Sequence, residues 1–145
     1  MTKTEKAAEI FNQGFNCAQS VLYTFADDLG INKEFALKVA SGFGAGMGRM
    51  QKTCGAVTGA VMVIGFFYGS SKSNDHFSKE RTYEAVQKFI KDFEKLHNTS
   101  DCIDLLGADM KTPEGKEKIQ KEDLIQTRCA KYVQDTVGLL EEKYF

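Results

Sequence analysis

Apolar residues recur at intervals of three and four over most of the chain, which is the spacing of one face of an α-helix. The clearest stripe lies after residue 75 and predicts an amphipathic surface helix; it consists of Tyr83, Val86, Phe89, Ile90 and Phe93. Shorter stripes predict helices over residues 4–13, 17–29, 35–40 and 102–106, from 113 onward, and from 133 to the end.

Residues 54–68 are almost wholly apolar and predict a helix in the core, because about fifteen residues are too few to cross a bilayer. The chain has one proline and no Asn-Gly or Asp-Gly pair, which argues against a sheet-rich fold with tight turns. No repeat or change of composition marks a domain boundary. We therefore predict an all-α fold: a single-domain bundle of about five to seven helices over residues 1–145.

The charges are balanced, with 19 Lys and Arg against 20 Asp and Glu in 145 residues. This balance removes the usual electrostatic reason for binding nucleic acid or an anionic membrane. The first residues carry no apolar stretch of the kind found in secretory signals. We expect a cytoplasmic protein that neither binds nucleic acid nor inserts into a membrane.

Four cysteines stand far apart along the chain, so any site they share must be assembled by the fold; they are Cys17, Cys54, Cys102 and Cys129. A residue type that commonly caps helices precedes each one by one or two positions; these residues are Asn16, Thr53, Ser100 and Thr127. The pattern predicts that every thiol lies in the first turn of a helix, where the helix dipole lowers a thiol pKa. Four such turns meeting at one point would hold a metal ion or cluster.

Small residues follow Cys54 on the same predicted helix. Gly55 and Gly59 are four positions apart, so they share a face and allow another backbone or a bulky inorganic centre to come close. Tight helix packing explains this face equally well. We take Gly55 and Gly59 as candidate cofactor-binding residues because Cys54 begins the same helix.

A glycine-rich run covers residues 41–49 and resembles a nucleotide loop. No strand precedes it, and Gln51 stands where a phosphate-binding loop needs glycine, so a nucleotide site is not predicted. The run is a flexible hinge or a nest of backbone N–H groups that would tune a cluster through hydrogen bonds to sulfur. Gly46 and Gly48 are therefore further candidate cofactor-binding residues.

Other roles for these residues stay open. Each cysteine alone is explained as well by burial as a small apolar side chain, and disulfides are a further alternative. His76 and His97 lie at the two ends of the amphipathic helix, where solvated or capping roles are commoner than metal binding. No catalytic residue is predicted.

The motifs together resemble the C_GCAxxG_C_C family of small helical proteins, to which a redox role is ascribed. The resemblance runs from about residue 7 to 140 and lies in residues 14–19, 43–49 and 54–59, followed by Cys102 and Cys129. Related domains joined to c-type haem modules look like iron–sulfur carriers, which implies that the four cysteines here are cluster ligands. The family implies no substrate or partner.

We therefore expect an iron–sulfur centre for electron transfer or sensing, with [2Fe–2S] preferred because four thiolates ligate it fully. One alternative is a structural Cys₄ zinc site without redox chemistry. Another is a metal-free thiol–disulfide protein with reversible pairs such as Cys17–Cys54 and Cys102–Cys129. The redox partner or oxidoreductase is unknown, and the apolar segment 54–68 could equally face a second copy in a homo-oligomer.

Overall fold

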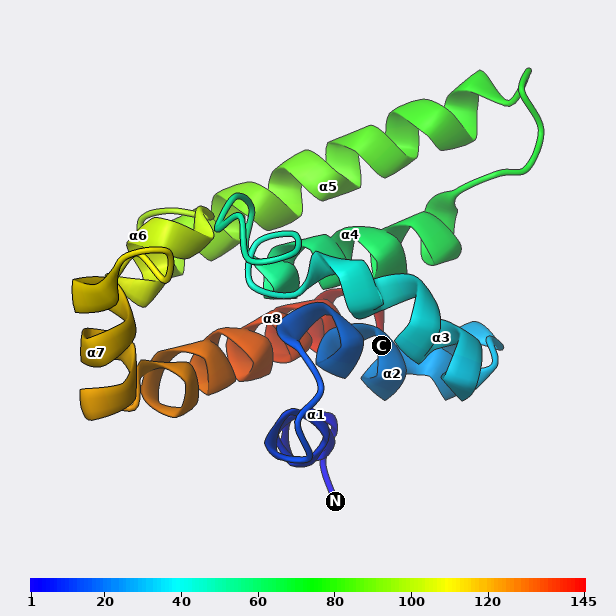
Figure 1. Cartoon of the computed structure of the whole chain (residues 1–145). Helices are drawn as coiled ribbons and strands as arrows, with labels where there is room; N and C mark the ends of the chain where they lie inside the picture. The colour runs from blue at the N-terminus through cyan, green and yellow to red at the C-terminus, as the bar shows by residue number, and fades with distance from the viewer.

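The computed structural model describes residues 1–145 and is all-helical (Figure 1). It contains eight α-helices, one 3₁₀ turn and one π-helical turn, with no strand beyond an isolated bridge between Thr53 and Asp101. The all-α prediction is confirmed, whereas five to seven helices was too few. Every stretch that the sequence predicts as helical stands as a separate helix, including the two short ones, one ended by Gly107 in the left-handed conformation and the next begun by Pro113, so the total exceeds the predicted range.

The helices follow the predicted apolar stripes. Their bounds are α1 Lys3–Asn12, α2 Cys17–Leu29, α3 Lys33–Ala40, the 3₁₀ turn η1 Ser41–Phe43, α4 Gly55–Tyr68, α5 His76–His97, α6 Cys102–Leu106, α7 Pro113–Lys121, the π-helical turn η2 Ile125–Cys129 and α8 Ala130–Tyr144. No helix is both long enough and apolar enough to span a membrane.

Helices α2, α3 and α7 each begin with a side-chain cap, and the cap expected at Asn16 is among these. The side-chain oxygens of Asn16, Asn32 and Thr112 each accept the backbone N–H three residues later. Asn16 forms a full capping box, because the Gln19 side chain accepts the Asn16 N–H in return. The start of α2, and with it the position of Cys17, is therefore set by local sequence.

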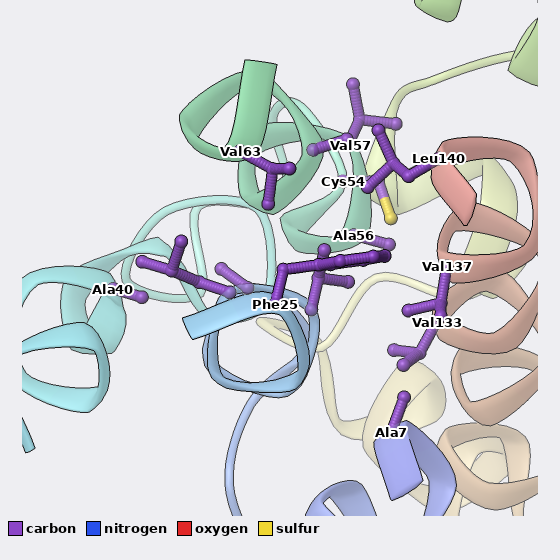
Figure 2. Packing of buried hydrophobic residues seen from close by; sticks show 14 of the residues in the cluster. Ala7, Phe25, Ala40, Cys54, Ala56, Val57, Val63, Val133, Val137 and Leu140 are labelled. Atoms are coloured by element: carbon purple, nitrogen blue, oxygen red, sulfur yellow. The ribbon is translucent and has the colours of Figure 1, made fainter. Parts of the chain in front are cut away.

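The core forms around α2 and α4, which pack together more extensively than any other pair. One buried apolar cluster takes residues from every α-helix except α7. Figure 2 shows Phe25 of α2 and Cys54 among the valines and alanines of this cluster. The helix predicted over residues 54–68 is thus confirmed as a core helix, with α5 on one side and α8 on the other (Figure 1).

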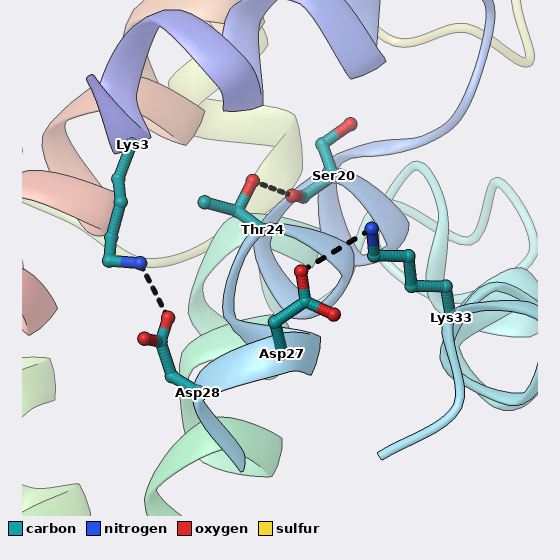
Figure 3. A network of polar contacts seen from close by, with 6 residues as sticks. All are labelled: Lys3, Ser20, Thr24, Asp27, Asp28 and Lys33. Carbon is teal, nitrogen blue, oxygen red and sulfur yellow. Dashed lines mark hydrogen bonds and ion pairs between the residues drawn. The ribbon is translucent and has the colours of Figure 1, made fainter. Parts of the chain in front are cut away.

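Polar contacts fasten the outer ends of α1, α2 and α3 (Figure 3). Lys3 pairs with Asp28, and Lys33 lies 3.4 Å from Asp27. These pairs are partly solvated, so each contributes little to stability. Most of the stability of the fold therefore comes from the buried packing between the helices.

Gly59 is the point where α4 comes closest to α2. A Cβ atom at Gly59 would lie 2.9 Å from the Val21 Cβ and 3.1 Å from the Ala18 carbonyl oxygen. The close approach to another backbone that we expected from this small-residue face is confirmed.

We expect Gly59→Ala to lower the free energy of unfolding by about 1–3 kcal/mol, because the added methyl overpacks this contact. Gly65 is a matched control on the same helix, since a Cβ there meets no atom within 4 Å. Gly65→Ala should leave stability unchanged or raise it by about 0.5–1 kcal/mol through helix propensity. Urea unfolding of both variants measures the difference, and equal stabilities would contradict the packing argument.

Candidate functional site

All four cysteines line one cavity of about 340 Å³. Cys17 is the first residue of α2, Cys54 directly precedes α4, Cys102 is the first residue of α6, and Cys129 ends the π-helical turn η2. Every pair is close enough for one thiolate to repel the other and raise its pKa. The fold therefore brings together four residues that the sequence keeps far apart.

A short antiparallel contact sets Cys54 beside Cys102. The Cys54 N–H donates to the Ser100 carbonyl at 2.8 Å, and the Cys102 N–H donates to the Lys52 carbonyl at 2.6 Å. The segments that lead into α4 and α6 are thus joined directly before each cysteine.

Gly55 sets the start of α4 against the start of α2. A Cβ atom on Gly55 would lie 3.1 Å from the Cys17 Cβ and 3.1 Å from the Phe43 carbonyl oxygen. A side chain at this position would press on both neighbours, so glycine favours the close approach of Cys17 and Cys54. Gly55, a candidate cofactor-binding residue, also lines the cavity.

Two side chains that flank Cys129 hold it opposite α6. The Arg128 guanidinium donates to the Leu106 carbonyl at 3.1 Å, and the Tyr132 hydroxyl donates to the Leu105 carbonyl at 2.7 Å. These carbonyls end α6 and have no partner within that helix. Sequence reasoning missed both side chains, and their only signal was their position one before and three after Cys129.

The prediction that every cysteine lies in the first turn of its own helix is wrong for Cys129. Its turn continues into α8 with helical backbone angles, so the amides that follow it are bonded within the helix. Thr127 therefore caps nothing. The cap positions of α4 and α6 also differ from those expected: Cys54 itself and Asp101 occupy them.

Burial, rather than the helix ends, dominates the pKa values of two thiols. Burial raises the pKa of Cys54 to about 11, although the N–H groups of Ala56 and Val57 act in the opposite direction. The pKa of Cys102 rises to about 12, first through burial and then through repulsion by the other thiolates. The lowered pKa expected at these helix starts is absent from the metal-free protein, because desolvation outweighs the dipole.

Cys17 and Cys129 form a hydrogen-bonded pair. The Cys17 thiol donates to the Cys129 sulfur, which raises the pKa of Cys17 well above its usual value and lowers that of Cys129. The positive charge of Arg128 lowers the pKa of Cys129 further, against the effect of burial. The thiol with the lowered pKa is thus the one that does not begin a helix. All four cysteines are free thiols in the structure.

The glycine-rich run forms a left-handed turn beside the cavity. Residues 45–49 and Gln51 all have positive φ. The N–H groups of residues 47–52 donate to carbonyls of the same run, so the anion nest proposed from the sequence is wrong for them. Ala45 and Gly46 line the cavity, and their N–H groups have no partner within the protein.

The four candidate glycines separate into two groups. Gly46 and Gly55 line the cavity, whereas Gly48 and Gly59 do not. At Gly46 a Cβ atom would lie 2.6 Å from the Lys52 nitrogen, so only glycine fits there. That Gly46 and Gly55 contact a bound group remains a prediction.

The cysteine thiols are the main groups around the cavity that could ligate a metal. Apart from the cysteines it is lined by apolar residues and by a few amides and one phenol, with no carboxylate and no histidine; Arg49 is its one charged side chain. Neither His76 nor His97 lines it, and His97 Nε2 lies 3.0 Å from an Asp135 oxygen. No three His, Cys, Asp or Glu side chains are arranged to bind one metal ion.

These features define a small all-helical protein with four thiols at one cavity. The family model described as "Putative redox-active protein (C_GCAxxG_C_C)" matches residues 15–143, a span that includes all four cysteines, and the chain belongs to this family. The resemblance noted in the sequence is thereby confirmed. No curated protein and no solved structure matches the chain.

Proposed function

We propose that the four cysteines bind an iron–sulfur cluster and that the protein uses it for electron transfer or sensing. The observation that carries this proposal is the lining of the cavity: thiols from four separate segments, without a carboxylate or imidazole. Thiolates are the donors that iron–sulfur clusters require. Membership of a family described as redox-active supports a redox role over a purely structural one.

The size of the cavity favours a cluster over a single zinc ion. Zinc–sulfur bonds of about 2.3 Å would place the four sulfurs of a tetrahedral site within roughly 4 Å of one another. A cluster of two or more irons holds its ligands further apart, and a cavity of about 340 Å³ leaves room for one. When bound, such a cluster accepts and donates single electrons.

The protein's own residues have four tasks at this site. Cys17, Cys54, Cys102 and Cys129 would give up their protons on ligation, so metal binding should release protons. The free N–H groups of Ala45 and Gly46 are available to sulfur. Arg49 supplies positive charge at the cavity, and the apolar side chains limit the access of water to the thiolates.

Anaerobic purification followed by iron, sulfide and zinc analysis tests this function. We expect a brown protein with visible charge-transfer absorption and with iron and sulfide in equal amounts. One zinc per chain in a colourless protein would instead support the structural site. A metal-free protein whose thiol count changes with redox conditions would support thiol–disulfide chemistry.

If the protein is instead a metal-free thiol–disulfide protein, the contact between Cys17 and Cys129 favours these two as the reacting pair. Their hydrogen bond and the lowered pKa of Cys129 support a Cys17–Cys129 pair, in place of the pairs Cys17–Cys54 and Cys102–Cys129 given as examples from the sequence. The Cys129 thiolate would attack a disulfide of another molecule and release one thiol. Cys17 would then attack Cys129, release the second thiol and close a Cys17–Cys129 disulfide.

A further inference from the structure

A second hollow of about 480 Å³ lies beside the cysteine cavity, against α7. The two share part of their walls, because Arg49 and Met110 line both. The other residues of the hollow are Lys111, Lys116, Ile119 and Gln120. A molecule bound in this hollow would therefore lie beside the cavity that the four thiols line.

The hollow is positively charged and its charges are unpaired. Arg49, Lys111 and Lys116 all line it, and no carboxylate does. None of the three forms an ion pair or a side-chain hydrogen bond within the protein. In a chain with a net charge of −1, three free cations around one hollow favour an anionic ligand.

Arg49 is held at the junction of the two cavities by a strained backbone. It has a φ of 66° and follows four consecutive residues that are also left-handed. Residues other than glycine rarely adopt this conformation, and they keep it only where the surrounding structure imposes it. Hydrogen bonds across the turn impose it here, including Arg49 N–H to the Gly44 carbonyl at 3.3 Å.

The opposite wall of the hollow is fixed to the same turn by Gln51. This side chain is only 3% exposed; its amide donates to the Ala108 carbonyl at 2.9 Å and accepts the Met110 N–H at 2.8 Å. The Lys118 ammonium also donates to the Gly107 carbonyl at 3.1 Å. The segment that leads to Lys111 is thus joined to the turn that carries Arg49. The backbone on both sides of the hollow is fixed, while the three cationic side chains are exposed to solvent.

We propose that Arg49, Lys111 and Lys116 bind the phosphate or carboxylate groups of a small organic anion and so place its remainder at the mouth of the four-cysteine cavity. Arg49 can donate two parallel hydrogen bonds to either group, while the two lysines act as point charges. Met110 and Ile119 supply an apolar wall for the rest of the molecule. The three cations line the hollow in the metal-free protein too, so binding of the anion can be measured without a cluster.

Calorimetric titration of the reduced, metal-free protein at low ionic strength tests the site, with pyrophosphate and propane-1,2,3-tricarboxylate as probes. We expect saturable binding of at least one probe, weakened at least tenfold by Arg49→Gln and by the pair Lys111→Gln and Lys116→Gln. The matched control is the pair Lys91→Gln and Lys95→Gln, two exposed lysines on α5, which removes the same charge elsewhere. Binding of only one probe identifies the anionic group as phosphate or carboxylate.

Alkylation of the thiols by the neutral reagent iodoacetamide tests the link to the cysteine cavity. A saturating probe should slow alkylation of the wild-type thiols and leave the rate unchanged in the Lys111 and Lys116 double variant. Binding of neither probe, or equal weakening by the α5 control, would overturn the site. Binding without any change in alkylation would overturn its placement at the mouth of the cavity. Loss of iron binding in the native protein would leave these results unaffected, so the two proposals fail separately.

Discussion

Replacement of any one of the four cysteines by alanine should remove most of the iron and sulfide from the anaerobically purified protein. Each of Cys17, Cys54, Cys102 and Cys129 comes from a different segment, and all four line the same cavity. No carboxylate or histidine lines it that could take the place of a lost thiolate. An iron left with an open position in a site partly accessible to solvent is exposed to oxidation and loss. Iron and sulfide per chain in the four variants measure the effect.

Gln126→Ala is the matched control for these variants. Gln126 lines the same cavity on the same turn as Cys129, but its amide is a poor ligand for iron. The Gln126→Ala variant should therefore keep its iron and sulfide. Full metal content in two or more cysteine variants would contradict a four-ligand cluster. A redox-dependent thiol count that is lost only on replacement of Cys17 or Cys129 would support the disulfide pair instead.

Periodicity and capping predicted most of the helices because both are local. The apolar stretch that forms α4 and the caps at Asn16, Asn32 and Thr112 need only a few neighbouring residues to act. Gly59 was also predictable, since a small residue in a core helix indicates close packing. These features required no knowledge of contacts between distant segments.

The position of Cys129 could not be predicted from local sequence. It depends on Arg128 and Tyr132, which bond carbonyls 22 and 27 residues earlier in the chain. The π-helical turn that holds it has no sequence signal comparable to a cap. Likewise, Cys54 and Cys102 meet through backbone hydrogen bonds between segments about fifty residues apart. Such bonds join main-chain groups, so they leave no signal in the identity of the side chains.

The pKa values show the same limit of local reasoning. A helix start favours a thiolate, and Cys54 does lie near the N–H groups of Ala56 and Val57. Burial in the folded core opposes this effect and exceeds it, so the pKa rises to about 11. Sequence alone shows the first effect and not the second.

The difference between Cys129 and the other thiols should appear in alkylation of the reduced, metal-free protein. The thiolate is the reacting form, so the rate follows the thiolate fraction. With a pKa of about 11, Cys54 carries on the order of one thiolate in ten thousand at pH 7, and Cys102, with a pKa of about 12, carries fewer still. Cys129, whose pKa is lowered, should react first at neutral pH. Peptide mapping by mass spectrometry after brief exposure to iodoacetamide gives the rate at each cysteine.

The pH dependence of these rates separates thiolate content from physical access. For Cys54 and Cys102 the rate should rise about tenfold per pH unit until pH approaches 11–12, whereas for Cys129 it should level off at a lower pH than for a free thiol. Cys17→Ala removes the thiol that donates to Cys129, so the pKa of Cys129 should rise and its rate at pH 7 should fall. Cys17→Ser is the matched control, because its hydroxyl can still donate. The alkylation rate of Cys129 could instead level off at the pH of a free thiol in both variants and in the wild type. That result would show that the Cys17 hydrogen bond does not set the pKa of Cys129.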